Sequence, residues 1–182
     1  MDSAPPGRPR RPGETTADRP RLSGMTDAPP ARSRLVAASL AAAGIPGKII
    51  VLPDAASTAA LAAAALGIEV GAIANSLVFW SDDEPLLVMT SGAHRVDTTA
   101  LAERLGRGAI RRATPDQVLA ATGQPIGGVA PTGHPAPLAT VVDEDLAAFA
   151  EIWAAGGTPH TVFPLTFDEL VRVTGGTVAR VA

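Results

Sequence analysis

The stretch "AIANSLVFWSDDEPLLVMTSG", residues 72–92, decides how this chain folds. Two apolar runs, 75–80 and 85–90, flank the acidic tip "SDDE" at 81–84. Apolar runs joined by a short polar turn predict a β-hairpin. The runs are largely continuous rather than alternating, which is typical of strands that are buried on both faces. Asn75 stands where the first strand begins, and an amide at such a boundary is either a turn residue or part of a site.

Short helices and strands are expected on both sides of this hairpin. Apolar spacing, capping residues and Gly or Pro stops predict helices at 31–43, 57–67, 97–106, 114–123 and 166–176. Short apolar runs predict further strands at 48–52, 109–113, 138–143, 151–155, 160–165 and 177–181. This order lacks a regular βαβ repeat, so we expect an α+β fold with a mixed, barrel-like sheet and flanking helices.

Length and composition indicate a single domain preceded by an extension. The chain has 182 residues, of which 46% are hydrophobic and only 3% aromatic, so its core must be built from Ala, Leu, Val and Ile. Residues 1–30 are rich in Pro, Gly and Arg without apolar periodicity, and we expect them to be a disordered N-terminal extension. Residues 31–182 are expected to form one domain. Met25 is a second candidate for the initiating residue.

Several classes of protein are disfavoured. The chain has no cysteine, which removes disulfides and thiol nucleophiles and suits the cytoplasm. No apolar run is long enough for a membrane span, so no membrane partner is expected. Residues 31–182 carry 10 basic and 14 acidic side chains. This excess of acidic side chains argues against DNA binding and means that any RNA partner is bound by a small part of the surface. The three histidines, His94, His134 and His160, are far apart in sequence, so neither a metal nor another cofactor is expected.

No familiar catalytic motif is present. There is no G-x-S-x-G nucleophile elbow and no phosphate-binding glycine loop. The loop "QPIGGVAPTGHPAP", 124–137, is long for a compact domain and rich in Gly and Pro. Its backbone N–H groups could bind a developing oxyanion, or the loop could be a rigid connector, and residues alone do not separate these readings. Likewise Gly156–Gly157 could be a hairpin turn, Asp143 a helix N-cap, and Arg95 a partner of Asp97.

Five segments, taken in order, resemble the YbaK/EbsC-type family, which includes prolyl-tRNA editing domains and free-standing aminoacyl-tRNA deacylases. They are "STAALAAAALGIEVGAIANSLVF", "LLVMTSGAHRVDTTALAERLG", "TPDQVLAATGQPIGGVAPTGHP", "VVDEDL" and "LTFDELVRVTGG". The resemblance covers roughly residues 45–182. It implies an editing activity outside the synthetase, in which the ester between a mischarged amino acid and the acceptor end of tRNA is hydrolysed. Backbone amides, a bound water and the substrate itself would then replace a protein nucleophile.

The resemblance also implies a site. Its catalytic residues are Asn75, Gly127 and Gly128, and its substrate-binding residues are Ser76, Arg95, Pro131, Gly133, His134, Asp143, Gly156 and Gly157. The chain departs from the family at Asn75, because the well-known deacylases have a lysine there. Asn keeps a hydrogen-bond donor but loses the charge. Arg95 is our candidate for supplying that charge.

Three functions remain open from the sequence. The first is a trans-editing aminoacyl-tRNA deacylase. The second is a non-catalytic module that binds an aminoacyl-adenosine-like ligand after loss of the lysine. The third is a hydrolase of another small ester or amide. The sequence does not say which amino acid or tRNA is used, or what the oligomeric state is.

Overall fold

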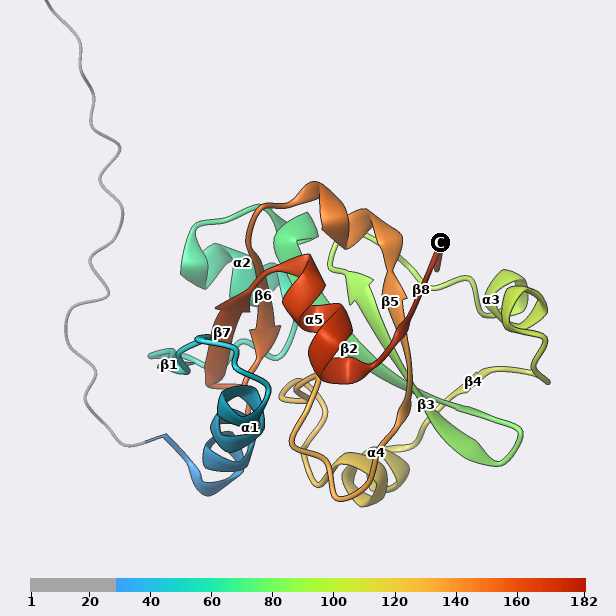
Figure 1. The fold of residues 1–182 in the computed structure, drawn as a ribbon, viewed down its shortest axis with the longest axis horizontal. Helices are drawn as coiled ribbons and strands as arrows, with labels where there is room; N and C mark the ends of the chain where they lie inside the picture. Colours follow the sequence, from blue (N-terminus) through green and yellow to red (C-terminus); the bar gives the residue numbers. More distant parts are fainter. Residues whose placement is uncertain (1–28) are drawn as a thin grey trace, which may run out of the picture.

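The computed structural model describes residues 29–182 of the chain (Figure 1). The predicted N-terminal extension, residues 1–30, lies outside the described residues except for Pro29 and Pro30, which belong to no helix or strand. Within the described part, no helix is long and apolar enough to cross a membrane.

One eight-stranded sheet organises the described residues. Its strands run in the order β1-β7-β6-β2-β3-β5-β8, with β4 paired to β2 off this path. Their bounds are β1 Ile50–Val51, β2 Ile73–Ser81, β3 Glu84–Ser91, β4 Arg111–Arg112, β5 Ala139–Asp143, β6 Ile152–Ala155, β7 Thr161–Leu165 and β8 Thr177–Ala179. The predicted hairpin is the β2–β3 pair. Asp82 and Asp83 at its tip have φ of 52° and 61°, the left-handed backbone that a two-residue turn of this hand requires.

The sheet is mixed. Antiparallel pairs join β2 to β3 and β6 to β7, whereas β2–β6, β3–β5 and β5–β8 are parallel. This confirms the predicted α+β class with a mixed sheet and flanking helices. The sheet is open within the described residues, with β1 and β8 as its two ends, where a closed barrel would pair them.

Five short helices flank the sheet. They are α1 Ala31–Ala42, α2 Ala59–Leu66, α3 Thr98–Leu105, α4 Pro115–Thr122 and α5 Phe167–Thr174, with 3₁₀ turns at Val70–Ala72 and Glu144–Ala148. From α2 onward, each α-helix begins after a capping Thr or Asp side chain and ends at a glycine in the left-handed region. These caps explain why four of the helices are only eight residues long.

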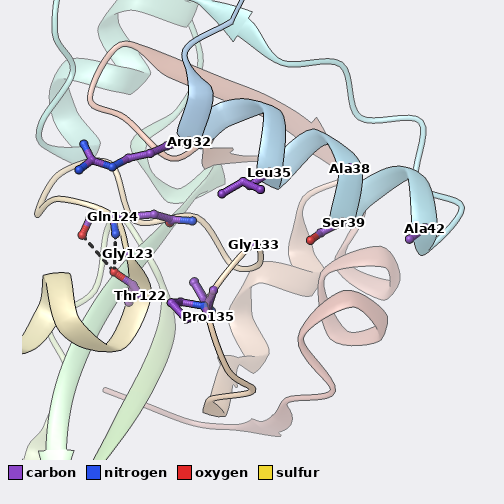
Figure 2. Close-up of a pocket in the computed structure, with 11 residues that line it drawn as sticks. Arg32, Leu35, Ala38, Ser39, Ala42, Thr122, Gly123, Gln124, Gly133 and Pro135 are labelled. Carbon is purple, nitrogen blue, oxygen red and sulfur yellow. Dashed lines mark hydrogen bonds between the residues drawn. The ribbon is translucent and has the colours of Figure 1, made fainter.

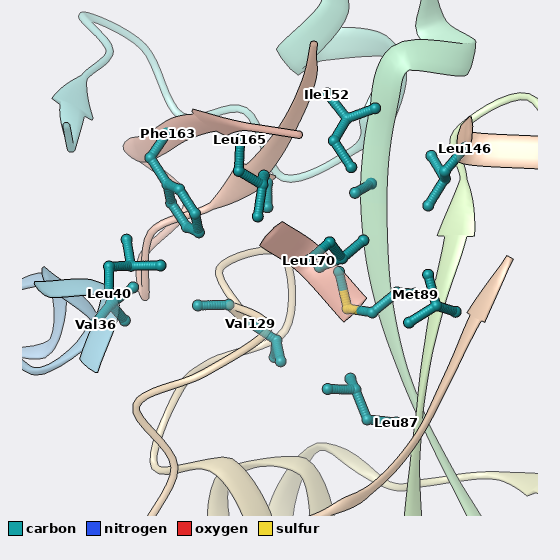
Figure 3. Close-up of a cluster of buried hydrophobic side chains, with 14 of the residues drawn as sticks. Val36, Leu40, Leu87, Met89, Val129, Leu146, Ile152, Phe163, Leu165 and Leu170 are labelled. Carbon is teal, nitrogen blue, oxygen red and sulfur yellow. The ribbon is translucent and has the colours of Figure 1, made fainter. Parts of the chain in front are cut away.

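The helices bury opposite faces of the sheet. The main core cluster (Figure 3) joins Val36 and Leu40 of α1, Val118 of α4 and Leu170 of α5 to one face. On the other face, α3 packs through Leu101 on a cluster around Phe79 and Val88. There α2 packs through Ala62 and Ala63 on a separate cluster around Ile73 and Val162. Figure 1 shows α2 and α3 well apart.

Candidate active site

A break in strand pairing lies beside β2. On the side away from β3, β6 pairs with Ile73 and Ala74, and β4 pairs with Phe79 and Trp80. Between these two short pairings, within residues 29–182, the stretch 75–77 has no strand partner on that side. The sheet therefore has a gap at the position of Asn75.

A cavity of about 290 Å³ occupies this gap. It is walled by the start of α2, by β2, by the loop after α4, and by β6 and β7. Its polar lining residues include Ser57, Asn75, Ser76 and Arg112, and Gly127 and Ala155 also line it. Asn75, Ser76 and Gly127 were all predicted as site residues, so the fold brings together predicted residues from two separate segments, β2 and the loop after α4.

Asn75 points to the face between the α2 and α3 clusters. Side chains alternate along a strand, and Ile73 and Phe79 on the same face belong to those two clusters. The Asn75 side chain is half-buried, and no other group in the described part of the chain accepts or donates a hydrogen bond to it. Its amide is therefore free to bind a ligand in the cavity.

Ser76 is not placed to act as a nucleophile. Its hydroxyl donates to Sδ of Met89 at 3.2 Å, in the main core. Of the residues that the structure describes, no histidine, Asp or Glu lines the cavity and could take its proton. The cavity thus offers hydrogen-bond donors rather than an activated nucleophile.

Gly127 and Gly128 let the loop after α4 pack closely against Ser57 and Thr158. Gly127 has φ of +82°, and a Cβ there would lie 2.9 Å from Cβ of Ser57. A Cβ on Gly128 would lie 2.5 Å from Cα of Thr158. The N–H of Gly128 donates to the carbonyl of Pro125, whereas that of Gly127 has no partner within the described residues. Only the Gly127 N–H is therefore open to a ligand.

The rest of the loop is held by a side chain that sequence reasoning missed. Gln124 is buried, accepts from the N–H of Ala130 at 2.7 Å and donates to the carbonyl of Thr132 at 3.1 Å. These two bonds fix the loop's path internally. The sequence feature that could have indicated this role is an amide side chain at the start of a Gly/Pro-rich loop. Such a loop needs side-chain partners for backbone groups that are not paired in a strand.

Pro131, Gly133 and His134 lie away from the Asn75 cavity. Gly133, with φ of +80°, packs against Val36 of α1. His134 donates from Nε2 to the carbonyl of Ala130 at 2.9 Å. Burial lowers the pKa of His134 below its ordinary value, and the bond to Ala130 opposes this only in part. His134 is therefore neutral near pH 7, and its hydrogen bond to Ala130 stabilises the loop.

A larger cavity, of about 600 Å³, lies between α1 and this loop. Figure 2 shows Arg32 and Leu35 of α1 facing Gln124 and Pro135 across it. Gly133 and His134 line it, and with Pro131 they also line a third cavity, of about 310 Å³. The predicted site residues are thus divided between separate cavities.

Asp143 is a buried structural acceptor. It is only 1% exposed, and it does not line the Asn75 cavity. It accepts from the N–H of Ser91 at 2.9 Å and from the hydroxyl of Thr90 at 3.3 Å, and it contacts Nδ1 of His94 at 2.8 Å. Thr90 is the cross-strand neighbour of Asn75, so Asp143 is connected to the site through one residue.

The fold gathers a histidine and two carboxylates that are distant in sequence. His94 contacts Asp143 through Nδ1 and lies 3.6 Å from Asp145 through Nε2. Groups of this type and spacing could hold a metal ion. Here both ring nitrogens face carboxylates, and Asp143 already accepts from the backbone, so the cluster is internally satisfied. No sequence spacing indicates this cluster, which forms because β3 and β5 lie side by side.

Three other predicted residues lie outside the cavity lining. The Gly156 N–H donates to the carbonyl of Thr161, as in the predicted hairpin turn. Gly157 packs against the Arg32 carbonyl at the start of α1. Arg95 is exposed in the segment before α3, and it forms no ion pair with Asp97.

The cavity contains an arginine that was not predicted. Among the described residues, Arg112 of β4 is the only ionisable one in its lining. Its guanidinium carbon lies 5.9 Å from the centroid of the Phe79 ring. The sequence "AIRRA" shows two adjacent arginines, but not which of them faces a cavity.

A model of the aminoacyl-tRNA editing domain family matches residues 53–173. The uncharacterized protein YwhH of Bacillus subtilis (strain 168) is 31% identical over 115 residues, which are 63% of this chain and 73% of YwhH. A proline–tRNA ligase of Nitratidesulfovibrio vulgaris (strain DP4) is 33% identical over 101 residues, which are 56% of this chain but only 16% of the ligase.

Solved structures agree with this match. A protein described as a candidate trans-editing enzyme for prolyl tRNA synthetase is 41% identical, with a TM-score of 0.79 over 85% of this chain and 98% of its own. The hypothetical protein APE2540 is 28% identical, with a TM-score of 0.75 over 81% of this chain and 98% of its own. The chain belongs to the aminoacyl-tRNA editing domain family. The predicted resemblance is confirmed, and with it the function class, deacylation of mischarged tRNA.

The family match also distinguishes the Asn75 cavity from the larger cavity beside α1. Every residue that lines the Asn75 cavity lies between 56 and 162, inside the matched range. The larger cavity takes one wall from α1, which precedes that range. We therefore take the Asn75 cavity as the candidate active site.

Proposed function

We propose that this chain removes mischarged amino acids from tRNA in trans, in the cavity beside Asn75, and that it acts in the cytoplasm. The observation that carries this proposal is the coincidence of three features at one place. The gap beside β2, the unengaged Asn75 amide and Gly127, whose N–H has no partner within the described residues, all lie at the same cavity of a tRNA-editing domain.

The reaction needs no protein nucleophile. A water molecule attacks the ester carbonyl carbon, and the carbonyl oxygen becomes an oxyanion in the tetrahedral intermediate. Nδ2 of Asn75 and the N–H of Gly127 donate hydrogen bonds to that oxyanion. The bond between the carbonyl carbon and the ribose oxygen then breaks. One proton of the attacking water goes to the ribose oxygen, which leaves as a hydroxyl, and the other is released to solvent as the amino acid leaves as a carboxylate.

The walls of the cavity suit an apolar amino-acid side chain. Six alanines line it: Ala56, Ala59, Ala62, Ala74, Ala154 and Ala155. The other apolar residues of the lining are Ile73, Leu77, Ile126, Val129, Trp153 and Val162. These walls would hold the aminoacyl group by burial, while the two donors fix the carbonyl. Such positioning accounts for a large part of the rate when the ester is already reactive.

Asn75 differs from the family's lysine in the free energy needed to bury it as well as in charge. A half-buried ammonium carries a desolvation penalty that a neutral amide avoids. The amide still presents two N–H donors to an oxyanion. It lacks the charge that attracts a phosphate, which another residue must supply.

The test is a deacylation assay with purified chain and a panel of tRNAs, each charged with a wrong amino acid. We expect hydrolysis of at least one above the uncatalysed rate. A blocking variant is Ala155→Leu, which fills the cavity from β6 and should abolish that activity. Background rates across the whole panel would refute the proposal.

A second function has its own observation in its favour, namely Asn75 itself. A module that lost the lysine would bind an aminoacyl-adenosine analogue without turning over charged tRNA. In that case Asn75→Lys would create an activity that the parent lacks. Measuring both proteins in the same panel separates the two functions.

A further inference from the structure

Arg112 is placed differently from every other cation in the described residues. It lines the Asn75 cavity, yet it comes from β4, at the opposite end of the β2 gap from β6. No carboxylate within residues 29–182 forms an ion pair with it. Its contact is with the face of Phe79, which holds the guanidinium at 5.9 Å and leaves its donors unused.

The charge of Arg112 determines how an aminoacyl nucleotide can lie in this cavity. The substrate has a positive α-ammonium at one end and a negative phosphate on the other side of the ribose. The ammonium is repelled by a guanidinium, whereas the phosphate matches its planar array of donors. The apolar walls at α2, β6 and β7 take the amino-acid side chain. The phosphate must then point toward β4.

We propose that Arg112 binds the phosphate on the 5′ side of the terminal adenosine, and so supplies the charge that Asn75 lacks. This proposal rests on the proposed function for the identity of the ligand. It assigns to Arg112 the role first predicted for Arg95; both arginines are exposed, but only Arg112 lines the cavity. Arg112 is thus a substrate-binding residue that orients the ester against Asn75 and Gly127.

The surrounding charge supports this orientation. Residues 31–182 carry 10 basic and 14 acidic side chains, but the segment 95–112 alone holds five of the basic ones and only two acidic ones. This segment includes α3 and ends at β4. A nucleic acid that leaves the cavity past Arg112 would therefore run over the most basic part of the domain.

The experiment measures binding of two non-hydrolysable probes by calorimetry. Both carry an alanyl group joined to the 3′ carbon of adenosine through an amide, and only one carries a 5′-phosphate. Alanine is used because it is small enough for a cavity of about 290 Å³. We expect the parent to bind the phosphorylated probe about tenfold more tightly, the size of one charge-assisted contact at an exposed site.

Three variants locate the effect. Arg112→Ala should remove most of this tenfold preference while leaving binding of the unphosphorylated probe unchanged. Arg112→Lys should retain part of it. Arg111→Ala is the matched control, because Arg111 is the adjacent exposed arginine of the same strand but does not line the cavity. It should keep the full preference. Circular dichroism confirms that each variant is folded.

The proposal is overturned if the parent binds both probes equally or binds neither. It is also overturned if Arg111→Ala and Arg112→Ala lose the preference alike. The charged-tRNA panel separates this failure from failure of the proposed function. If the parent hydrolyses charged tRNA but shows no preference for the phosphorylated probe, only the role proposed for Arg112 is contradicted. If the parent prefers the phosphorylated probe but hydrolyses no charged tRNA, only the proposed deacylase activity is contradicted.

Discussion

Replacing Asn75 by Ala removes one donor from the cavity without removing any hydrogen bond from the folded protein. The side chain is half-buried and unengaged within the described residues, so truncation should change the free energy of unfolding by no more than about 1 kcal/mol. If its amide binds the oxyanion, the loss of one preorganised donor should lower kcat roughly 10²- to 10³-fold. This contrast between activity and stability identifies a catalytic role.

The assay is single-turnover hydrolysis of the charged tRNA that the panel identifies, with unfolding in urea measured on the same samples. Asn75→Asp is the matched variant, because it keeps the shape but replaces the N–H donors with a negative charge. It should be at least as slow as Asn75→Ala. A rate for Asn75→Ala within about threefold of the parent, with both proteins folded, would refute the reasoning, since one such donor is worth far more.

Three further predictions concern stability. Asp143→Asn should lower the free energy of unfolding in urea by about 2–4 kcal/mol, because it disrupts a buried acceptor of four groups; an effect under 1 kcal/mol would contradict this. Gly128→Ala should cost at least about 1–3 kcal/mol in the same assay, since its Cβ would lie 2.5 Å from Cα of Thr158; a neutral result would mean the loop moves freely. Burial lowers the pKa of His134 in the folded protein, so the unfolded state binds the proton more readily. The protein therefore keeps its full stability above the ordinary histidine pKa near 6.5 and loses stability as the pH falls through the lower folded pKa. His134→Gln should flatten this acid-side loss, and an unchanged pH profile would exclude His134 as its source.

Local sequence signals predicted the parts of the fold that depend on near neighbours. The acidic tip at 81–84 predicted the β2–β3 hairpin, and Asp82 and Asp83 adopt the left-handed backbone that their short polar side chains tolerate. Thr114 and Thr166 form the capping boxes that begin α4 and α5. Such features are set within a few residues, which is why the sequence reveals them.

The site could be predicted only in part. The resemblance located Asn75, Ser76 and Gly127, and these do line one cavity. The gap that makes the cavity comes from β6 pairing in parallel with only the first residues of β2, which no local pattern encodes. Arg112 was missed because "IRRA" does not reveal which arginine lies against Phe79 until β4 is paired with β2.

Asp143 illustrates a different limit. Its position after a predicted strand favoured an N-cap, and it does accept from the N–H of Asp145 at the start of a 3₁₀ turn. Its bonds to Ser91 and Thr90 depend on β3 lying beside β5, which is a long-range parallel pairing. A local role and a long-range role coexist in one carboxylate, and only the first can be inferred from the sequence.

The claim that the cavity beside Asn75, rather than the one under α1, holds the aminoacyl end can be measured directly by NMR. The phosphorylated alanyl-amide probe is titrated into labelled chain, and the side-chain amide signal of Asn75 is assigned from its absence in Asn75→Asp. We predict that this signal and the backbone signal of Gly127 shift with saturation, while those of Ser39 and Gly133 in the α1 cavity stay in place. Shifts confined to Ser39 and Gly133, with Asn75 unchanged, would contradict the account.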